Sequence, residues 1–299
     1  MSTIKEAPVA PAPRPAAAEP PRPVNGRHRA WDEVPRWQIY LPLSVYLVFT
    51  LIPFYWILLF ALRPAGSTSL VPWPMTFDHF EKVWTERDFG VYFQNSVLVG
   101  LATLVLTTVV ALAGGYALAR FDFKVKRGFM LALLCSQFVP GALLLVPLFE
   151  IFAELKMINS LGSVILAETV FQLPLSMILI SNFIKNVPYS LEEAAWVDGC
   201  NRFTAFRVIV LPLLRPGLIA VGSFAFVHSW NHFLFALMFL NNQQKQTIPV
   251  GLNTLMSSDS VDLGALAAGG IIAAVPVVIV FAFIQKWLIT GFSAGAVKG

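Results

Sequence analysis

The sequence predicts an all-α protein that crosses a membrane with six helices. Hydrophobic residues make up 57% of its 299 residues and charged residues only 13%, whereas soluble domains carry about a quarter charged residues. Six separate apolar runs approach the roughly 20 residues that a membrane-spanning helix needs. Lys and Arg gather in alternate segments between these runs. The three observations together indicate a polytopic membrane protein.

The predicted spans follow one another with short polar connections. Several contain a single proline, which buried membrane helices tolerate because neighbouring groups satisfy the freed carbonyl. The second and sixth contain clusters of Gly and Ala, and small residues of this kind let two helix backbones approach closely. The spans are expected over residues 38–62, 95–119, 129–152, 162–184, 217–240 and 265–289.

The distribution of positive charge predicts the orientation of these spans. Of the 21 Lys and Arg residues, 16 fall in the N-terminal segment, the 120–127 loop, the 185–215 loop and the C-terminal end, and only 5 fall in the other loops. Loops rich in Lys and Arg stay on the cytoplasmic side. We therefore expect both termini to be cytoplasmic, which agrees with an even number of spans.

Composition divides the chain into three parts. Residues 1–35 are rich in Pro and Ala and lack the apolar stretch of a signal peptide, so we expect a disordered cytoplasmic tail. Residues 36–290 form the six-helix transmembrane domain. Residues 291–299 contain one large apolar side chain, Phe292, and are expected to form a short cytoplasmic tail.

Two outer loops differ in character. In the loop at 63–94, Phe77, Phe80 and Trp84 recur at helical spacing among acidic residues, which predicts a short amphipathic helix at the outer surface. Its apolar side is expected to pack on the protein's own spans. The segment at 241–263 is expected to be a polar loop.

A short polar helix is predicted inside the cytoplasmic loop between the fourth and fifth spans. Ser190 and Glu193 have the spacing of a capping box at a helix start. Gly199 is the expected end of the helix. Leu191 and two small residues, Ala194 and Ala195, should share one face that another surface could approach. The helix is therefore interpreted as a docking element, with an amphipathic elbow lying on the membrane as the alternative.

The same loop carries the pattern of a known family. The matching residues are Glu193-Ala194-Ala195, Asp198-Gly199, Phe206, Ile209, Leu211-Pro212 and Pro216. In this spacing, between the fourth and fifth of six spans, segment 188–216 resembles the EAA loop of ABC-transporter importer permeases. Residues 291–299, the 116–120 stretch Tyr-Ala-Leu-Ala-Arg and Trp230-Asn231 are similar to the maltose-type carbohydrate permeases, those of the second permease subunit.

The resemblance implies a function and partners. The chain would be the transmembrane permease subunit of an ATP-driven sugar importer in a bacterial cytoplasmic (plasma) membrane. It would form a heterodimer with a second permease subunit and would bind an ABC ATPase dimer and an extracytoplasmic substrate-binding protein. The resemblance implies no nucleic-acid partner. The implied ATPase-coupling residues are Glu193, Ala194, Ala195, Asp198 and Gly199, and the implied ATPase-contacting tail residues are Ser293, Ala294 and Gly295.

The remaining motifs argue against chemistry in this chain. No G-x-x-x-x-G-K-[ST] motif occurs, so ATP would be bound by a partner ATPase and this chain would need no cofactor. His228 and His232 lack the intervening Glu of a zinc protease, so no metal site is predicted. An importer for another cargo (glycerol phosphodiester, polyol or peptide), an intramembrane hydrolase and an ion-coupled carrier stay open as alternatives.

One acidic residue lies well inside a predicted span. At 1.5 Å per residue, Glu168 is about 9 Å from the outer end of the fourth span, and His232 is about 12 Å from the outer end of the fifth. A charge within a membrane is costly and calls for a partner. We expect Glu168 and His232 to hydrogen-bond or to line a polar cavity, and Glu168, Asn231 and His232 are the candidate residues of a translocation path.

Overall fold

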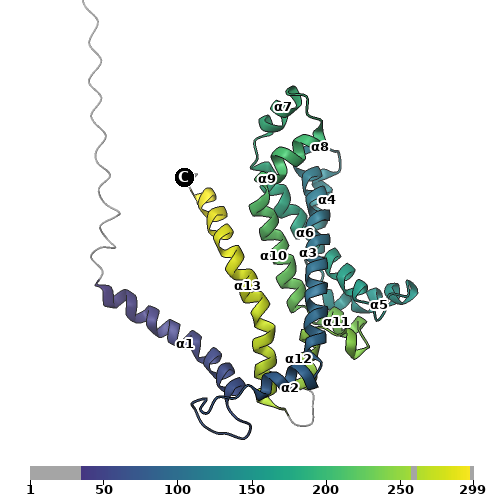
Figure 1. The fold of residues 1–299 in the computed structure, drawn as a ribbon. Coiled ribbons are helices and arrows are strands. Elements are labelled where there is room, and N and C mark those ends of the chain that lie inside the picture. The colour runs from purple at the N-terminus through teal and green to yellow at the C-terminus, as the bar shows by residue number, and fades with distance from the viewer. Residues whose placement is uncertain (1–34, 257–260, 297–299) are drawn as a thin grey trace, which may run out of the picture. The chain divides into compact units, whose positions relative to one another are not determined.

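The computed structural model describes residues 35–256 and 261–296, with side chains described as far as residue 285. The described residues form helices and no strands, as the sequence predicts (Figure 1). The elements are α1 (Arg36–Leu62), α2 (Asp78–Glu86), α3 (Phe89–Arg120), α4 (Lys126–Ser136), η1 (Gly141–Leu144), α5 (Leu145–Glu154), α6 (Leu161–Lys185), α7 (Tyr189–Val197), α8 (Arg202–Ala205), η2 (Phe206–Val210), α9 (Leu211–Leu213), α10 (Arg215–Asn231), α11 (Leu234–Phe239), η3 (Gln243–Lys245), α12 (Ile248–Met256) and α13 (Leu263–Ala296).

The chain divides into two compact units between Ile52 and Pro53. The first unit contains the N-terminal part of α1, whose described side chains are exposed. The second contains the end of α1 and all later helices. The predicted disordered tail at residues 1–35 lies, apart from residue 35, outside the described residues.

Four helices are long and apolar enough to cross a membrane: α1, α3, α6 and α13. They correspond to four of the six predicted spans. Two bent helix pairs raise the possible number to six: α4 with η1–α5, bent by 94°, and α8–α9 with α10, bent by 73°.

Two predicted spans are wrong as continuous helices. The span predicted at 129–152 breaks between Ser136 and Gly141, where Pro140 is extended and has no N–H to continue the helical bonding. The span predicted at 217–240 ends at Asn231, because His232 is extended before α11 begins. No Gly or Pro marks that second break, so the apolar pattern gave no sign of it.

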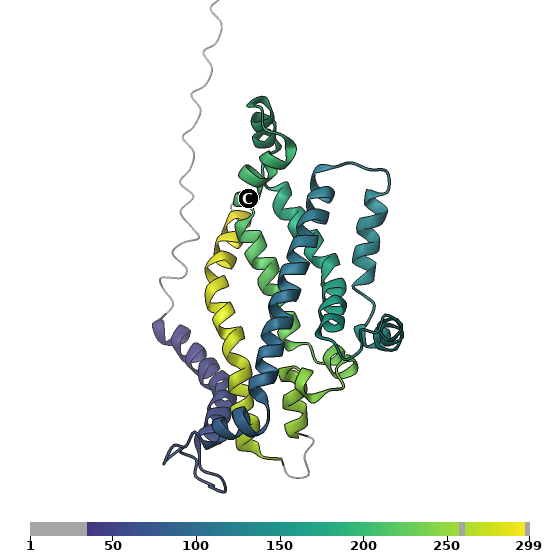
Figure 2. The ribbon, with the colours of Figure 1, turned by 45° about the vertical axis from the view of Figure 1, so that its right-hand side comes forward.

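Helices α3, α6 and α10 lie side by side and form the centre of the second unit (Figures 1 and 2). Gly115 explains how closely α3 and α6 approach: a Cβ at this position would lie 3.1 Å from the Met177 carbonyl oxygen and 2.9 Å from Ile180 Cβ. The prediction that Gly114-Gly115 marks a close helix contact is confirmed.

Two sets of short helices lie at opposite ends of this centre. Helices α7 and α8 lie at one end, and α2, α11 and α12 lie at the other (Figure 2). The segment predicted as a polar loop at 241–263 in fact contains α12, with Ile248 and Val250 buried in the core. Sequence reasoning missed this helix because the residues on both sides of it are polar.

The predicted amphipathic helix is present as α2, and Phe80 and Trp84 pack on the rest of the unit as expected. Phe77 is exposed, whereas His79 and Val83 are buried against the rest of the unit. His79 Nε2 lies 3.2 Å from the Arg63 carbonyl oxygen, and Lys82 Nζ donates a 3.0 Å hydrogen bond to Asp262 just before α13. The first contact ties α2 to the residue after α1, and the second ties it to the start of α13.

Candidate functional site

Helix α7 begins two residues earlier than the capping box predicts, at Tyr189 and not at Leu191. Pro188 is the N-cap with an extended backbone, and no side chain caps the helix. Ser190 therefore lies inside the helix and Glu193 is exposed, so the capping-box prediction is wrong. A proline with its φ already fixed is enough to set the start of the helix.

The end of α7 matches the prediction at Gly199. Its φ is +89°, in the left-handed region that favours glycine. Gly199 N–H donates to the Trp196 carbonyl at 3.0 Å, and Cys200 N–H donates to the Ala195 carbonyl at 2.9 Å. The chain is thereby turned sharply from α7 toward α8.

The described side chains divide the coupling residues into an outer and an inner set. Glu193, Ala194 and Asp198 are exposed, and Val197 beside them is 88% exposed. Ala195 is buried inside the unit. Ala194 and Ala195 therefore do not share one open face, and only the outer set is available to another surface.

A buried ion pair joins α7 to the end of α3. Glu192 is fully buried, and Arg120 Nε donates to its Oε1 at 2.6 Å. Tyr116 Oη donates to the other carboxylate oxygen at 2.7 Å. Arg120 Nη2 also donates to the Val187 carbonyl at 2.9 Å. We call Tyr116, Arg120 and Glu192 the clamp; both carboxylate oxygens of Glu192 have charge-assisted or hydroxyl partners.

Sequence reasoning missed the clamp. The sequence assigns no partner to Glu192, and Arg120 is counted there only among the cytoplasmic charges. The available signal was the Tyr-Ala-Leu-Ala-Arg stretch, which places a phenol and a guanidinium one turn apart on the same side of a helix end. It identifies no partner, because Glu192 lies 72 residues further along the chain.

A second buried glutamate lies between α6 and α10. Glu168 is 1% exposed, and its Oε1 lies 3.8 Å from Nδ1 of His232. The structure thus brings the two residues together, but the distance exceeds that of a hydrogen bond. Oε2 of Glu168 and Nδ1 of His232 have no hydrogen-bond partner. Gln172, one turn further along α6, is buried with neither amide atom paired.

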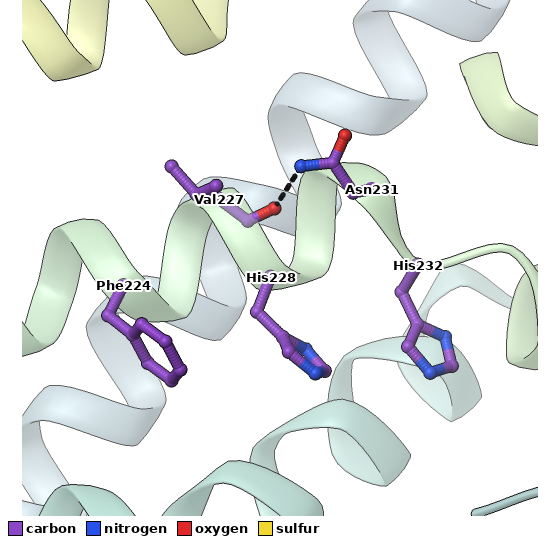
Figure 3. A pocket seen from close by; sticks show the side chains of 5 residues that line it. All are labelled: Phe224, Val227, His228, Asn231 and His232. Carbon is purple, nitrogen blue, oxygen red and sulfur yellow. Dashed lines mark hydrogen bonds between the residues drawn. The ribbon is translucent and has the colours of Figure 1, made fainter.

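A row of flat rings follows the same side of α10. Successive ring centroids from Phe224 to His228, His232 and Phe235 are 6.3, 5.5 and 4.4 Å apart. Figure 3 shows the first three rings projecting from one side of the helix, with Asn231 turned toward Val227. The Asn231 amide donates to the Val227 carbonyl at 2.8 Å, which leaves its own oxygen as an acceptor. We call Phe224, His228 and His232 the ring row.

The ring row borders two cavities. The first has a volume of about 370 Å³ and is lined by Phe224, Val227, His228, Asn231 and His232. The second, of about 190 Å³, shares His228 and His232 and is also lined by Ser136, Gln137, Val139, Gly141, Phe171 and Phe235. Within the described part of the chain, neither set of lining residues includes a Lys, Arg, Asp or Glu.

Two further sequence-based expectations concern metals and the C-terminal end. The described residues hold no group of three or more His, Cys, Asp or Glu that could bind a metal ion. Ser293, Ala294 and Gly295 lie in the last turns of α13, which runs to Ala296. Their side chains, and residues 297–299, lie outside the described part of the structure.

The fold and these two regions can now be compared with known proteins. Residues 111–293 match the family of binding-protein-dependent transport system inner membrane components. This match covers more than half of the chain. The chain belongs to the ABC-importer permeases. Like other members of this family, it is a multi-pass inner-membrane component that catalyses no reaction, and a separate ATPase subunit handles ATP.

Several carbohydrate-uptake permeases are similar to this permease over most of their length. It is 35% identical over 277 residues to the diacetylchitobiose uptake system permease protein DasC of Streptomyces coelicolor, covering 91% of this chain and 98% of that one. It is 32% identical over 265 residues to the sulfoquinovosyl glycerol permease SmoH of Agrobacterium fabrum, covering 87% and 93%. It is 31% identical over 256 residues to the trehalose permease SugB of Mycobacterium tuberculosis, covering 84% and 93%.

A solved structure supports the fold. The permease is similar to a chain of a bacterial alginate ABC importer with a TM-score of 0.71 and 18% identity, covering 84% of this chain and 97% of that one. The family is binding-protein-dependent, and another alginate transporter structure contains a periplasmic protein. Membership in this family of ATP-driven importers excludes the intramembrane hydrolase and the ion-coupled carrier.

Proposed function

We propose that this permease forms one half of the translocation path of a sugar importer and transmits the movement of an ATPase through α7. The observation that carries the cargo class is the full-length relationship to permeases named for diacetylchitobiose, trehalose and sulfoquinovosyl glycerol. These cargoes differ in size and charge, but all are sugars or sugar derivatives. The relationship covers the whole membrane domain, so the same architecture would serve this importer.

The proposed assembly is a heterodimer with a second permease subunit, joined to an ABC ATPase dimer, an extracytoplasmic substrate-binding protein and the lipid bilayer. Large apolar side chains exposed on α1 and α13 support contacts with lipid or the second subunit. The excess of Lys and Arg in the 120–127 and 185–215 loops supports an orientation with α7 and both termini in the cytoplasm.

The proposed ATPase contact is the outer set of α7, Glu193, Ala194 and Asp198. Ala195 and Gly199 would act differently, by seating the helix and by turning the chain after it. Transmission of a movement needs a rigid element, and the clamp supports this role because it holds α7 to the end of α3 through buried hydrogen bonds.

The C-terminal residues Ser293, Ala294 and Gly295 are proposed to contact the ATPase as well. The support for this contact is the similarity of the ending to maltose-type permeases. Deleting residues 294–299 should lower transport per ATP hydrolysed while membrane insertion is kept. Unchanged transport by the deletion variant would exclude a contact between the tail and the ATPase.

Glu168, Asn231 and His232 are proposed to belong to the translocation path. All three lie near the break between α10 and α11, and Asn231 and His232 line the larger cavity. Interrupted helices at mid-membrane expose backbone and polar groups to a cargo site in transporters. Glu168 would act from behind His232, since it is buried and does not line either cavity.

Reconstitution of the assembly tests the proposed function. The complex is isolated through a tag on this permease, together with its co-expressed partners, and placed in liposomes containing ATP. Uptake of a labelled sugar should require ATP, the binding protein and this chain, and Asp198→Ala with Glu193→Ala should uncouple ATP hydrolysis from uptake. ATP hydrolysis without uptake of any di- or trisaccharide in a broad panel would contradict a sugar importer.

A further inference from the structure

We infer that the ring row is a cargo subsite of this permease for an uncharged sugar ring, and that it rejects sugar acids. The inference rests on the proposed function and deepens it by naming the charge class of the cargo. It assigns two residues, Phe224 and His228, beyond those that the sequence indicates. Three observations carry it: the spacing of the rings, the polar atoms beside them and the absence of positive side chains in the cavity linings.

The ring spacing fits a flat ligand with apolar faces. Phe224, His228 and His232 recur every four residues, so their rings stand along one side of α10 beside a cavity of about 370 Å³. That volume is within the roughly 300–1,000 Å³ of small-molecule sites. A sugar ring has C–H faces, which can pack on aromatic faces that carry partial negative charge.

Asn231 lines the same cavity as the rings, although its side chain projects from another side of α10 (Figure 3). The Asn231 side-chain oxygen remains free to accept a hydrogen bond after the amide has bonded to Val227. Nδ1 of His232 has no partner, and behind it Glu168, 1% exposed, keeps an unpaired oxygen. Hydroxyl groups donate and accept at once, so a sugar beside the rings could bond to the exposed side chain of Asn231. His232 Nδ1 and the Glu168 oxygen are buried and would support the site from behind.

The charges of the site disfavour a sugar acid. No Lys or Arg lines either cavity among the described residues, so a carboxylate or sulfonate would find no paired cation. Glu168 lies 3.8 Å from His232. With one proton between them this pair is neutral, and with none it is negative. The face of the Phe224 ring is also negative, so an anion entering here would lose its hydration without a compensating partner.

The alternative is that Phe224, His228 and His232 only face lipid or the second permease subunit. In that case a charge placed on the row would have the same effect as one placed on another exposed phenylalanine. Phe224 is 46% exposed and lines the larger cavity, whereas Phe283 is 67% exposed on α13 and lines neither. These two positions give a matched pair of substitutions.

The test measures uptake into liposomes containing the complete complex with its binding protein. The probes are neutral disaccharides, including diacetylchitobiose and trehalose, and a uronic acid disaccharide, cellobiouronic acid, beside its neutral counterpart cellobiose. We expect the unmodified complex to import the best neutral sugar at least tenfold faster than the acid. Phe224→Lys should raise the ratio of acid to neutral uptake at least fivefold, and Phe283→Lys should leave it unchanged.

The binding protein is the same in every complex, so a change in this ratio between complexes locates the selection in this chain. His228→Ala should lower neutral uptake at least fivefold while the complex stays assembled on size-exclusion chromatography. Equal ratios for Phe224→Lys and Phe283→Lys, or equal uptake of acid and neutral sugars, would overturn the inference and leave the sugar importer standing. Uptake of no sugar would overturn both.

Discussion

Two glutamates are buried in the described part of this permease, and their surroundings are opposite. Glu192, on α7, has both carboxylate oxygens bonded, to Arg120 and to Tyr116. Glu168, on α6, has an unpaired oxygen and a histidine 3.8 Å away. A buried charge with all its partners holds a fixed geometry, whereas a buried polar group without partners is strained until something binds or moves. The paired Glu192 therefore suits an element that transmits force, and the unpaired Glu168 suits a region that rearranges around cargo.

The two regions also differ in what surrounds them. The clamp is one compact ion pair at a helix end. The region around Glu168 continues along α6 as a run of buried polar residues with unpaired atoms, among them Thr169, Gln172 and Ser176. Unpaired buried polar atoms cost about 1–3 kcal/mol each. A permease can carry that cost where its helices must rearrange around a polar cargo.

The largest expected effect is the loss of the clamp's cation. Arg120→Ala leaves Glu192 buried without its charge partner, which should lower the free energy of unfolding by about 3–5 kcal/mol. Arg127→Ala removes an exposed cation from the first turn of α4 and should have little effect. Thermal unfolding of the purified complex measures both. If the two variants have the same melting temperature, the ion pair does not hold α7 to α3.

A rescue experiment sharpens the same point. Replacing both partners, Arg120→Met with Glu192→Met, removes the buried charges together and should recover most of the stability lost by Arg120→Ala, because apolar pairs often substitute well for buried ion pairs. Loss of ATP-coupled transport in the double variant, despite recovered stability, would assign the clamp a role in coupling beyond folding.

The next effect concerns the turn after α7. Gly199 and Gly66 both have a positive φ with open space around the missing Cβ, so alanine at either should cost roughly 1–2 kcal/mol of backbone strain. Only Gly199→Ala should also lower uptake per ATP hydrolysed. Gly199→Pro should do so more strongly, because it also removes the N–H that bonds to Trp196. Equal coupling in the two alanine variants would place the α7 turn outside the transmission path.

A smaller effect is expected from the Glu168–His232 pair. Glu168→Gln and His232→Gln, made singly and together, should be non-additive in stability by about 0.5–1 kcal/mol because the two groups are neighbours. His79→Gln combined with Glu168→Gln is the control, since His79 lies on α2 and should give additive effects. Strict additivity in the first cycle would mean that Glu168 and His232 do not interact.

The smallest effect is a pH dependence at Asp262. Burial raises the pKa of this carboxyl, but the Ala265 N–H and the Lys82 ammonium outweigh burial and lower it below its usual value. A carboxyl with a lowered folded pKa stabilises the protein above its unfolded pKa, near 3.9, and loses this contribution as the pH falls through the folded pKa. The stability difference between the unmodified complex and Asp262→Asn should therefore be present at pH 6 and shrink below about pH 4.

The Asp262 effect has its own control. Asp122 pairs with Lys126 but its side chain is fully exposed, so Asp122→Asn should change stability little at any pH, because exposed ion pairs contribute little. A difference for Asp262→Asn that persists unchanged at pH 3 would contradict the assignment of the effect to the ionised carboxylate.

The sequence predicts the long spans well because each is a continuous apolar run. Helices α1, α3, α6 and α13 cover those runs, although α3 already starts at Phe89 and α13 continues to Ala296. It does not predict the breaks near Pro140 and His232, because a single proline is compatible with a membrane helix and His232 bears no breaking signal. The burial of α12 was also missed, since its flanking residues are polar.

For the two candidate regions, local signals succeeded and distant ones failed. The turn at Gly199 needs only one residue of known preference, and Glu168 was identified because an acid inside an apolar run is unusual. The clamp needs a contact across 72 residues, and the ring row needs a cavity beside its side of α10. Neither requirement is visible in spacing alone.

The most direct test compares the two glutamates in the same complex. Glu192→Gln and Glu168→Gln change the same atoms in two environments, and thermal unfolding is measured together with sugar uptake per ATP hydrolysed. We expect Glu192→Gln to lower the melting temperature and to uncouple hydrolysis from uptake. Glu168→Gln should leave the melting temperature unchanged or higher while sugar uptake falls. Equal destabilisation by both substitutions would contradict the distinction between a paired, force-transmitting glutamate and an unpaired one that supports the cargo site from behind His232.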